Sequence, residues 1–286
     1  MYIEDYLISV VTIVKNDLKA LKKTLYSLPK SNSLKSIIID GSNDSKPQKY
    51  FCQEFEKSSG IFVDYHVQNN TGLFAAMNEG LLKTKSPWVL FMCAGDTFDV
   101  GADKIFKIIN EISPNDFSSI IFKSKIISSK GYLIGIKPPS NLLNPNLFKA
   151  LNFIIPWLYT PCHQSVVFKT EDHKKILYEE SGTIGSDEYV MGQFMKKSFY
   201  LSDFVVSLND TCGVSSNPPP TISKFFWYLN SSIKLKQPRR FIFLIIKFTI
   251  ASLGLRNFDK IRFLRHKFIT PILLFFVRIL NKIWIF

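Results

Sequence analysis

Short polar segments follow apolar runs in the first hundred residues, and their side chains are of the kinds that bind nucleotides and metal ions. These segments are Asn16-Asp17, Asp40 to Asp44, Asn69 to Gly80 and Cys93 to Asp96. A carboxylate at such a position can accept hydrogen bonds from a base or a ribose, or bind Mg²⁺ or Mn²⁺. Glycine allows the backbone to approach a ligand closely. Because Asn, Asp and Gly are also ordinary turn residues, their recurrence matters more than any single one.

The apolar runs alternate with helical patterns, and this alternation predicts an α/β fold. The predicted strands are 7–14, 36–39, 61–67 and 88–92, and the predicted helices are 17–28, 48–57 and 73–83. The first run is β-branched and continuously apolar, which is typical of a strand buried on both faces. Strands joined by helices form a parallel sheet, and its ligands bind beyond the carboxyl ends of the strands. The polar segments should therefore meet at one edge of the sheet.

The order of these motifs resembles glycosyltransferase family 2, whose members have the GT-A fold. The similarity lies in LISVVTIVKN, IIIDGSNDS, NNTGLFAAMNEG and WVLFMCAGD, and it continues through CHQSVVF, IGSDEYVMGQF and DTCGVSSN. It covers about residues 7–217, in the order of the family. The resemblance implies a mostly parallel sheet flanked by helices. It also implies inverting transfer of a sugar from a nucleoside diphosphate sugar.

The resemblance further implies a role for each matching residue. The positions matched to the nucleotide and the donor sugar are Thr12, Asn16, Asp40, Gly72, Asn78 and Asp96. Among them, Asp40 would read the nucleobase, and Asp96 would bind a divalent cation, Mn²⁺ or Mg²⁺. Asp187 matches the catalytic base of the family. His163 and Gln164 match a pair beside the acceptor cleft.

An inverting transfer needs a base, because the acceptor hydroxyl loses its proton while its oxygen attacks the anomeric carbon. A carboxylate can take this proton, and a divalent cation neutralises charge on the departing diphosphate. Asp187 begins a predicted helix at 187–197, where the helix dipole favours a carboxylate. The simple alternative is that Asp187 only caps this helix. Glu188 is the alternative base.

Two departures from the family pattern bear on the metal and the donor. Relatives with a complete metal motif carry two or three acids after the fourth strand, whereas Cys93-Ala94-Gly95 leaves only Asp96. Relatives also tend to have Asp-Lys-Gly where this chain has Asn70-Thr71-Gly72, and Asp at the position of Ala75. The lost charges predict an altered donor or a weak activity. The alternative function is a weakly active or inactive member that acts as a membrane-associated assembly partner.

The C-terminal part of the chain is strongly basic and rich in aromatic residues. The net charge is +13, and the region from Lys224 onward has thirteen Lys or Arg residues, eleven Phe residues and one acid. Its apolar runs, 241–255 and 269–286, are short and interrupted, which disfavours a bilayer span. The pattern predicts amphipathic helices in an anionic membrane interface. A buried core appendage or a partner interface is the alternative, and nucleic acid is disfavoured because it leaves the phenylalanines unexplained.

The sequence therefore predicts a catalytic domain at 1–217 and a helical, membrane-associating region at 218–286, divided at three consecutive prolines. The expected donor is a nucleoside diphosphate sugar, with a UDP-sugar favoured, and the expected acceptor is a lipid-linked glycan or oligosaccharide. The expected location is the cytoplasmic side of the cell membrane, as a peripheral protein. A nucleotidyltransferase would need a glycine-rich loop after the first strand, and the segment Lys15 to Leu18 has no glycine.

The remaining features are less specific. Four widely spaced cysteines without a CxxC pair predict free thiols. Two apolar runs around residues 128–131 predict a hairpin at 117–136. Trp157 and Tyr159 are candidates for stacking on a sugar ring; the alternative is that they lie in the core or face a membrane.

Overall fold

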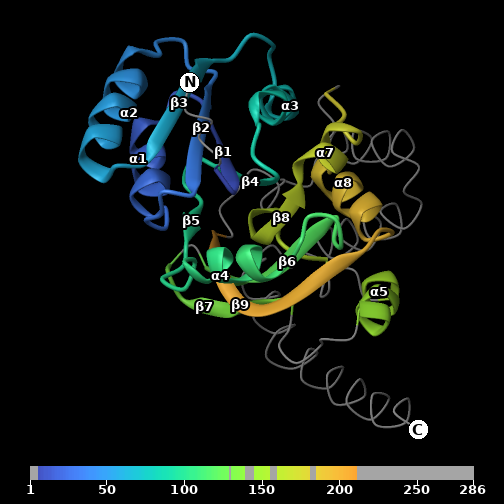
Figure 1. Ribbon diagram of the computed structural model, residues 1–286. Coiled ribbons are helices and arrows are strands. Elements are labelled where there is room, and N and C mark those ends of the chain that lie inside the picture. The colour runs from blue at the N-terminus through green and yellow to red at the C-terminus, as the bar shows by residue number, and fades with distance from the viewer. Residues whose placement is uncertain (1–5, 129, 139–144, 155–159, 181–184, 211–286) are drawn as a thin grey trace, which may run out of the picture. The chain divides into compact units, whose positions relative to one another are not determined.

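The computed structural model describes residues 6–128, 130–138, 145–154, 160–180 and 185–210 (Figure 1). The chain divides into two compact units, of which the first comprises Met1–Ser124 and Lys137–Asn209. The second comprises Lys125–Ile136 and Asp210–Phe286. All residues predicted for the site belong to the first unit. The predictions for 218–286, for Cys212 and for Trp157 and Tyr159 lie outside the described residues.

The first hundred residues contain every strand and helix predicted there, with ends that agree to within two residues. The elements are β1 (Ile8–Val14), α1 (Leu18–Tyr26), β2 (Leu34–Asp40), α2 (Lys46–Ser59), β3 (Phe62–Val67), α3 (Leu73–Lys83) and β4 (Trp88–Cys93). The next elements are β5 (Thr97–Phe98), α4 (Lys104–Glu111), β6 (Ser119–Ile127), β7 (Leu133–Lys137) and α5 (Pro145–Ile154). The last are the 3-10 helix η1 (His163–Ser165), β8 (Val166–Lys169), α7 (Thr170–Lys174), α8 (Ser186–Phe194) and β9 (Phe199–Asp210).

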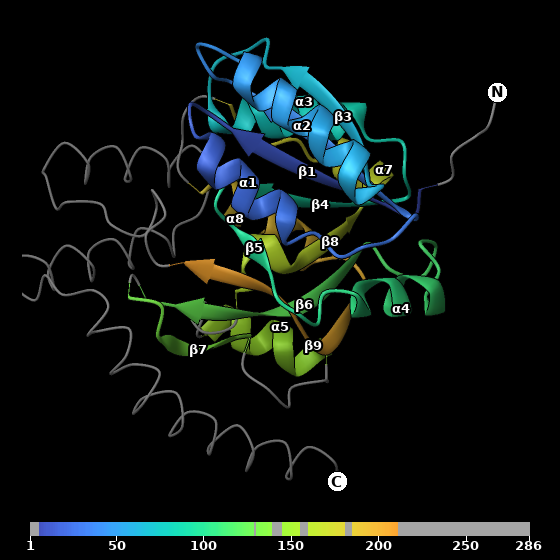
Figure 2. The ribbon, with the colours of Figure 1, turned by 90° about the vertical axis from the view of Figure 1, so that its left-hand side faces the viewer.

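The strands form one sheet in the order β3-β2-β1-β4-β8-β6-β9-β5, and β7 pairs with β6 as the predicted hairpin (Figure 2). β1 is parallel to β2 and β4, and β2 is parallel to β3. β8 is antiparallel to both β4 and β6. The expected α/β architecture with a parallel sheet is therefore confirmed in β1 to β4. The carboxyl ends of these four strands lie at one edge of the sheet, so the polar segments that follow them come together there, as predicted.

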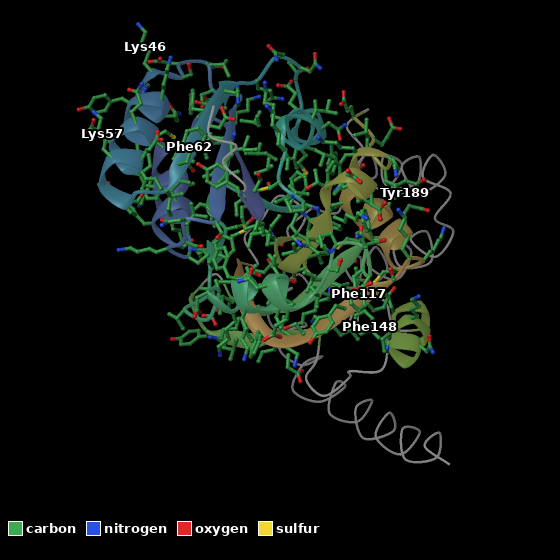
Figure 3. All side chains as sticks on the ribbon, in the orientation of Figure 1. Lys46, Lys57, Phe62, Phe117, Phe148 and Tyr189 are labelled. Carbon is green, nitrogen blue, oxygen red and sulfur yellow. The ribbon has the colours of Figure 1, made fainter. Side chains whose placement is uncertain are left out.

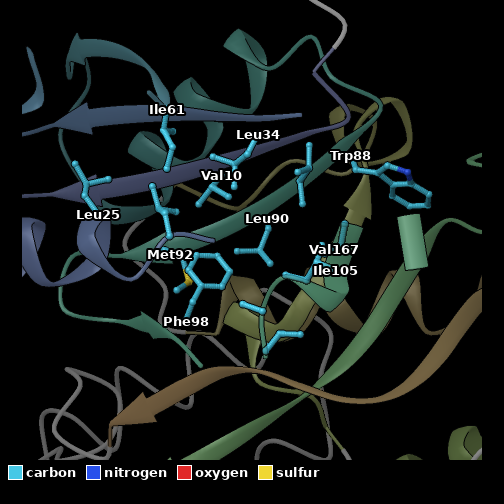
Figure 4. Close-up of a cluster of buried hydrophobic side chains, with 14 of the residues drawn as sticks. Val10, Leu25, Leu34, Ile61, Trp88, Leu90, Met92, Phe98, Ile105 and Val167 are labelled. Atoms are coloured by element: carbon cyan, nitrogen blue, oxygen red, sulfur yellow. The ribbon is translucent and has the colours of Figure 1, made fainter. Parts of the chain in front are cut away.

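Helices cover both faces of the parallel strands. Successive side chains of a strand point to opposite faces, so these strands pack against helices on both sides. Val10 and Val14 belong to a core cluster that includes Leu25 of α1, and Figure 4 shows part of this cluster. Val11 faces α3 instead, where its Cγ1 lies 2.3 Å from the position that a Cβ at Gly80 would occupy. In Figure 1, α1 and α2 lie on one side of these strands and α3 on the other. Burial on both faces explains why β1 consists mostly of Ile and Val, with Ser9 and Thr12 as its polar residues.

Aromatic packing fixes the helix α5 against the antiparallel half of the sheet. The ring of Phe148 meets that of Phe199 of β9 edge to face, with 5.8 Å between the ring centroids (Figure 3). Lys149 Nζ lies 5.1 Å from the centroid of the same Phe199 ring. This contact anchors the chain shortly before η1, which carries two of the predicted site residues.

Candidate active site

The carboxylate of Asp96 is held by donors from two segments. Its Oδ2 accepts a hydrogen bond from Cys93 N at 2.9 Å and another from Gln164 Nε2 at 3.1 Å. The turn between Cys93 and Asp96 needs glycine at position 95, where φ is +104°. The structure therefore joins the acid predicted to bind metal to a residue predicted on the acceptor side.

A threonine of α1 fixes the same turn. Thr24 Oγ1 donates to the carbonyl oxygen of Asp96 at 2.7 Å and accepts from Gly95 N at 2.9 Å. Thr24 is fully buried beside Leu21 and Leu25. The sequence analysis missed this residue. A polar residue on the apolar face of an amphipathic helix is the signal that points to it, since buried polar groups are normally hydrogen-bonded.

Asp187 lies in the first turn of α8, close to Cys93 and Tyr178. Burial raises the pKa of the Cys93 thiol, and the nearby carboxylates of Asp96 and Asp187 raise it further. Burial also raises the pKa of Tyr178, followed by the charges of Asp187 and Cys93. Asp187 is half-buried, whereas Glu188, the alternative base, is exposed. Asp96 and Gln164 thus meet beside Cys93, and Asp187 is near enough for its charge to act on the Cys93 thiol.

The helix that carries Asp187 is shorter than predicted. It begins at Ser186 and ends at Phe194, so the predicted end at residue 197 is wrong. The backbone N–H groups of Lys196 and Lys197 bond three residues back, to Gln193 and Phe194, which is the pattern of a tightening final turn. Gly185, with φ of +95°, allows the sharp entry into the helix.

The carboxylate of Asp40 is fully buried and is hydrogen-bonded to the loop after β2. Its Oδ1 accepts from Ser42 N at 2.8 Å, and its Oδ2 accepts a hydrogen bond from the hydroxyl of Tyr65 on β3. Burial and this hydrogen bond to Asp40 raise the pKa of Tyr65, so its hydroxyl stays a donor. Asp40 therefore ties β2 to β3 and sets the backbone of the loop at Ser42.

The loops after β1 and β2 are bonded to each other. Asn16 N donates to Ser42 Oγ at 2.7 Å, and Asn16 Oδ1 accepts from Asn43 N at 2.9 Å. Gln48 of α2 also donates to Ser42 Oγ, at 3.0 Å. Gln48 Oε1 and Thr12 Oγ1 are buried and have no hydrogen-bond partner within the described part of the chain. Buried polar atoms of this kind are left for water or a ligand to satisfy.

Asn78 and Gly72 both belong to α3 and its entrance. Asn78 Nδ2 donates to Tyr178 O at 2.9 Å and to Glu180 Oε1 at 2.7 Å, while its Oδ1 accepts from Tyr178 N at 2.9 Å. Gly72 has φ of +114°, and its carbonyl oxygen accepts from Gln68 Nε2 at 2.8 Å. Asn78 therefore connects α3 to the segment before α8, and Gly72 sets the start of α3.

His163 is buried behind Gln164 in a polar cluster with a second histidine. Its Nε2 lies 2.7 Å from the hydroxyl oxygen of Tyr178, and His173 Nε2 lies 3.0 Å from the same oxygen. Burial lowers the pKa of His163 to about 4 and that of His173 to about 3. Both imidazoles are therefore neutral at neutral pH. The sequence analysis named His163 but missed Tyr178 and His173.

The acidic side chains fit a divalent cation held through one carboxylate. No group of three His, Cys, Asp or Glu side chains that could hold a metal ion occurs among the described residues. Mg²⁺ usually keeps several waters and is bound by one or two carboxylates together with substrate phosphates. Asp96 would be that carboxylate, and the bound ion would neutralise charge on a diphosphate.

Comparisons with known proteins identify the fold. S. aureus TarS 1–349 in complex with UDP-GlcNAc superposes with a TM-score of 0.56 and 15% identity, over 91% of this chain and 79% of that chain. The mannosyltransferase PcManGT from Pyrobaculum calidifontis, in complex with GDP-Man and Mn²⁺, gives 0.52 and 11%, over 91% and 84%. Both likenesses show the GT-A fold.

Sequence comparisons identify the family. A search of curated proteins gave no match. The profile described as "Glycosyl transferase family 2" matches residues 9–177, which is more than half of the chain. This span includes β1 to β4, η1 and the turn that carries Asp96. The chain therefore belongs to glycosyl transferase family 2 and is a glycosyltransferase with the GT-A fold.

Proposed function

We propose that the protein transfers a sugar, with inversion, from a nucleoside diphosphate sugar to a hydroxyl group of a glycan acceptor. The observation that carries this proposal is that Asp96 and Gln164 bond to each other beside Cys93, at the carboxyl end of β4, with the charge of Asp187 near enough to act on the Cys93 thiol. A nucleotide sugar as donor is supported by the two structural relatives, which bind UDP-GlcNAc and GDP-Man.

The nucleoside is assigned to the loops after β1 and β2. Thr12 Oγ1 and Gln48 Oε1 are buried polar atoms without hydrogen-bond partners among the described residues, near the loop that Asn16 and Asp40 hold in place. A uracil base, which offers both a donor and acceptors, suits such a mixed set of groups. The base-reading role that the resemblance implies for Asp40 stays a prediction, and the carboxylate of Asp40 fixes the loop at Ser42. Gly72 and Asn78 shape the donor-sugar side through α3.

In the reaction, the carboxylate of Asp187 takes the proton of the acceptor hydroxyl as the oxygen attacks the anomeric carbon. The bond to the nucleoside diphosphate breaks on the opposite face. Asp96 would hold Mn²⁺ or Mg²⁺, which neutralises charge on the diphosphate. Gln164 keeps the Asp96 carboxylate in one orientation. His163 directly precedes Gln164 and is held in the core by its hydrogen bond to the hydroxyl of Tyr178.

The proposed acceptor is a lipid-linked glycan, and the protein is proposed to work as a peripheral protein on the cytoplasmic side of an anionic membrane. The exposed residues of α1 support this. Lys19, Lys22, Lys23 and Tyr26 lie at spacings of three and four, so they share one face of the helix. None of the three lysines forms an ion pair with the described residues. No described helix has the length and hydropathy needed to cross a bilayer.

The substitution Asp187→Asn tests the proposed function. The amide keeps the size of the side chain but cannot take a proton, so turnover should fall by about 10²- to 10⁴-fold while donor binding persists. The measurement is release of nucleoside diphosphate from UDP-GlcNAc, UDP-glucose and GDP-mannose, with calorimetry for donor binding. Glu188→Gln, which changes an exposed neighbour, should keep wild-type turnover.

Two outcomes would overturn this assignment. Wild-type turnover in Asp187→Asn, together with a loss in Glu188→Gln, would move the base to Glu188. A wild-type protein that binds donors and turns over none of them would favour the alternative function, an inactive member that acts as an assembly partner. The single acid left in the segment Cys93 to Asp96 is the observation on which that alternative rests.

A further inference from the structure

We propose that Tyr178 is a positioning residue that sets the place of Asp187 relative to Asp96 and Gln164. Tyr178 lies outside every motif that the sequence analysis singled out, and it also lies just beyond the family match, which ends at residue 177. The inference rests on the proposed function, in which Asp187 is the base. Three sets of contacts carry it.

The first set is made by the hydroxyl group of Tyr178. It lies between His163 Nε2 at 2.7 Å and His173 Nε2 at 3.0 Å. Because burial keeps both imidazoles neutral, each Nε2 either donates or accepts a hydrogen bond, depending on the tautomer, and a tyrosine hydroxyl can donate to one and accept from the other. The hydroxyl thus connects α7 to η1. His163 is followed directly by Gln164, which bonds to Asp96.

The second set is made by the backbone of Tyr178. Both its N–H and its carbonyl oxygen bond to the side chain of Asn78, each at 2.9 Å. The next residue, Glu179, donates its N–H to Ser186 Oγ at 2.6 Å. Ser186 is fully buried and directly precedes Asp187. A short path of backbone and hydrogen bonds therefore leads from Tyr178 to the proposed base.

The third set is made by the ring of Tyr178, which is 2% exposed. It stacks on Phe74 of α3, with 5.7 Å between centroids and 16° between planes. It also meets Phe91 of β4 edge to face, at 5.5 Å and 82°. Contacts to the ring, the hydroxyl group and the backbone together restrict the position of the Tyr178 side chain. Tyr178 is thus fixed to α3, β4, α7 and η1 at once.

This arrangement predicts an effect on turnover rather than on donor binding. A base placed about 1 Å from its productive position can lose up to about 10²-fold in rate. The donor-side residues Thr12, on β1, and Asn16, on the loop after it, form no hydrogen bond with Tyr178 in the described part of the chain. The bonds of Asn78 to Tyr178 involve only the backbone of Tyr178, and these bonds persist when the hydroxyl is removed. Loss of the hydroxyl should therefore lower kcat and leave the donor KM unchanged.

The test is Tyr178→Phe in the full chain, which keeps the ring contacts and removes the hydroxyl. Turnover is measured as nucleoside diphosphate release from the fastest of UDP-GlcNAc, UDP-glucose and GDP-mannose. We expect kcat to fall by about 10-fold or more, with the donor KM within about twofold of wild type. Tyr50→Phe, a hydroxyl removed from an exposed site on α2, should leave both constants unchanged. A fall in the affinity for donor with kcat unchanged would overturn the proposal.

A double-mutant cycle with Asp187→Asn shows whether Tyr178 acts through Asp187. In the Asp187→Asn background, Tyr178→Phe should lower kcat by less than about twofold, because the base is already lost. Equal effects in both backgrounds would mean that Tyr178 acts independently of Asp187 and would overturn the inference. Wild-type turnover in Asp187→Asn alone would instead refute the proposed base, so the two failures are distinguishable.

A second variant covers the case in which Tyr178→Phe does not fold. His173→Gln keeps the tyrosine hydroxyl and its bond to His163 but alters its other partner. It should lower kcat by a few-fold, at unchanged donor KM, and this loss should also vanish in the Asp187→Asn background. A His173→Gln protein with wild-type kcat would contradict a positioning role for this cluster.

Discussion

At the scale of single residues, the contacts of Asp96 define what this carboxylate is expected to do. Donors from Cys93 N and Gln164 Nε2 fix one of its oxygens, so the side chain is oriented before any ligand arrives. A preoriented carboxylate binds a metal ion without first losing side-chain freedom. One carboxylate is enough for Mg²⁺ or Mn²⁺ when substrate phosphates complete the shell.

We therefore expect turnover to depend on a divalent cation bound through Asp96. Asp96→Ala should abolish the increase in UDP affinity that Mn²⁺ gives to the wild-type protein, because the ion loses its protein ligand. Calorimetry with and without MnCl₂ measures this difference. Gln164→Ala is the graded control, since it keeps the carboxylate and should keep a weaker metal effect. Full turnover in excess EDTA would refute a metal role for Asp96.

The buried histidines make stability depend on pH. Burial places the pKa of His163 at about 4 and that of His173 at about 3, below the ordinary 6.5. At pH values between about 6.5 and 4, the unfolded chain binds protons that the folded chain does not. The free energy of unfolding therefore falls as the pH falls through this range. From pH 7 to pH 5 the loss should reach up to about 2 kcal/mol for each histidine.

Urea unfolding at pH 7 and pH 5 measures this loss. In His173→Gln, which has one titrating ring fewer, about half of the histidine contribution should disappear. Acidic residues also contribute to the pH dependence, but they are the same in both proteins, so the difference isolates His173. An identical pH dependence in the variant would show that His173 takes up its proton at the same pH in the folded and the unfolded chain.

The residues at strand ends could be predicted from the sequence, but most of their partners could not. Asn16, Asp40 and Asp96 follow apolar runs, and that pattern is local. Thr24 and Tyr178 act through hydrogen bonds to segments about 70 and 100 residues away, at Asp96 and Asn78. Such pairs depend on the tertiary packing. The roles assigned to the site residues stay predictions.

At the scale of elements, the packing of α3 on the sheet depends on one glycine. A Cβ at Gly80 would lie 2.3 Å from Val11 Cγ1 and 3.3 Å from Ile39 Cγ1. Both neighbours are fully buried, so neither can move away without disturbing the core. Gly80→Ala should therefore destabilise the protein by about 1–3 kcal/mol, as overpacking does.

A second glycine provides the matched control. Gly192 is in the interior of α8, is exposed, and would have no atom within 4 Å of an added Cβ. Gly192→Ala should stabilise the protein by about 0.5–1 kcal/mol, because alanine loses less backbone entropy in a helix. Urea midpoints of the two variants should move in opposite directions. A Gly80→Ala protein as stable as wild type would mean that α3 can shift away from β1.

The parallel elements could be predicted from the sequence because each is long and strongly patterned. β1 is a fully buried seven-residue strand with five Ile or Val residues, and α1 has a cap at Asp17, whose Oδ1 accepts from Ala20 N at 2.8 Å. The antiparallel half is different. β8 has four residues and β5 has two, and both are placed by partners far along the chain. A local pattern of two to four residues cannot specify such pairings.

At the scale of the whole molecule, the membrane proposal involves two segments rich in basic residues. The region from Lys224 onward carries thirteen basic residues and one acid, and the exposed face of α1 carries Lys19, Lys22 and Lys23. On α2, where Figure 3 labels Lys46 and Lys57, the charges are partly compensated, since Lys57 pairs with Glu54 at 2.9 Å. The division of the chain at residue 217 stays a prediction.

Removal of residues 222–286 should release the protein from vesicles that contain anionic lipid, because the basic and aromatic residues of this region are lost together. High salt should release the full chain only partly, since salt screens charge but not apolar burial. Cosedimentation with vesicles of 30% phosphatidylserine measures both effects. The shortened protein should still bind UDP, because the predicted nucleotide residues precede the cut. Unfolding of the shortened protein would instead support the alternative of a buried appendage.

The face of α1 makes a separate prediction within the full chain. Reversing three charges, in Lys19→Glu, Lys22→Glu and Lys23→Glu together, should weaken vesicle binding by roughly 10²-fold, at about 1 kcal/mol for each lysine that reaches the surface. The matched control reverses Lys85, Lys107 and Lys175, which are exposed on three separate segments. This control changes the net charge by the same amount. If α1 itself lies on the lipid, the control should weaken vesicle binding much less than the α1 variant does. Equal losses in the two variants would mean that only net charge matters, and that α1 does not contact the membrane.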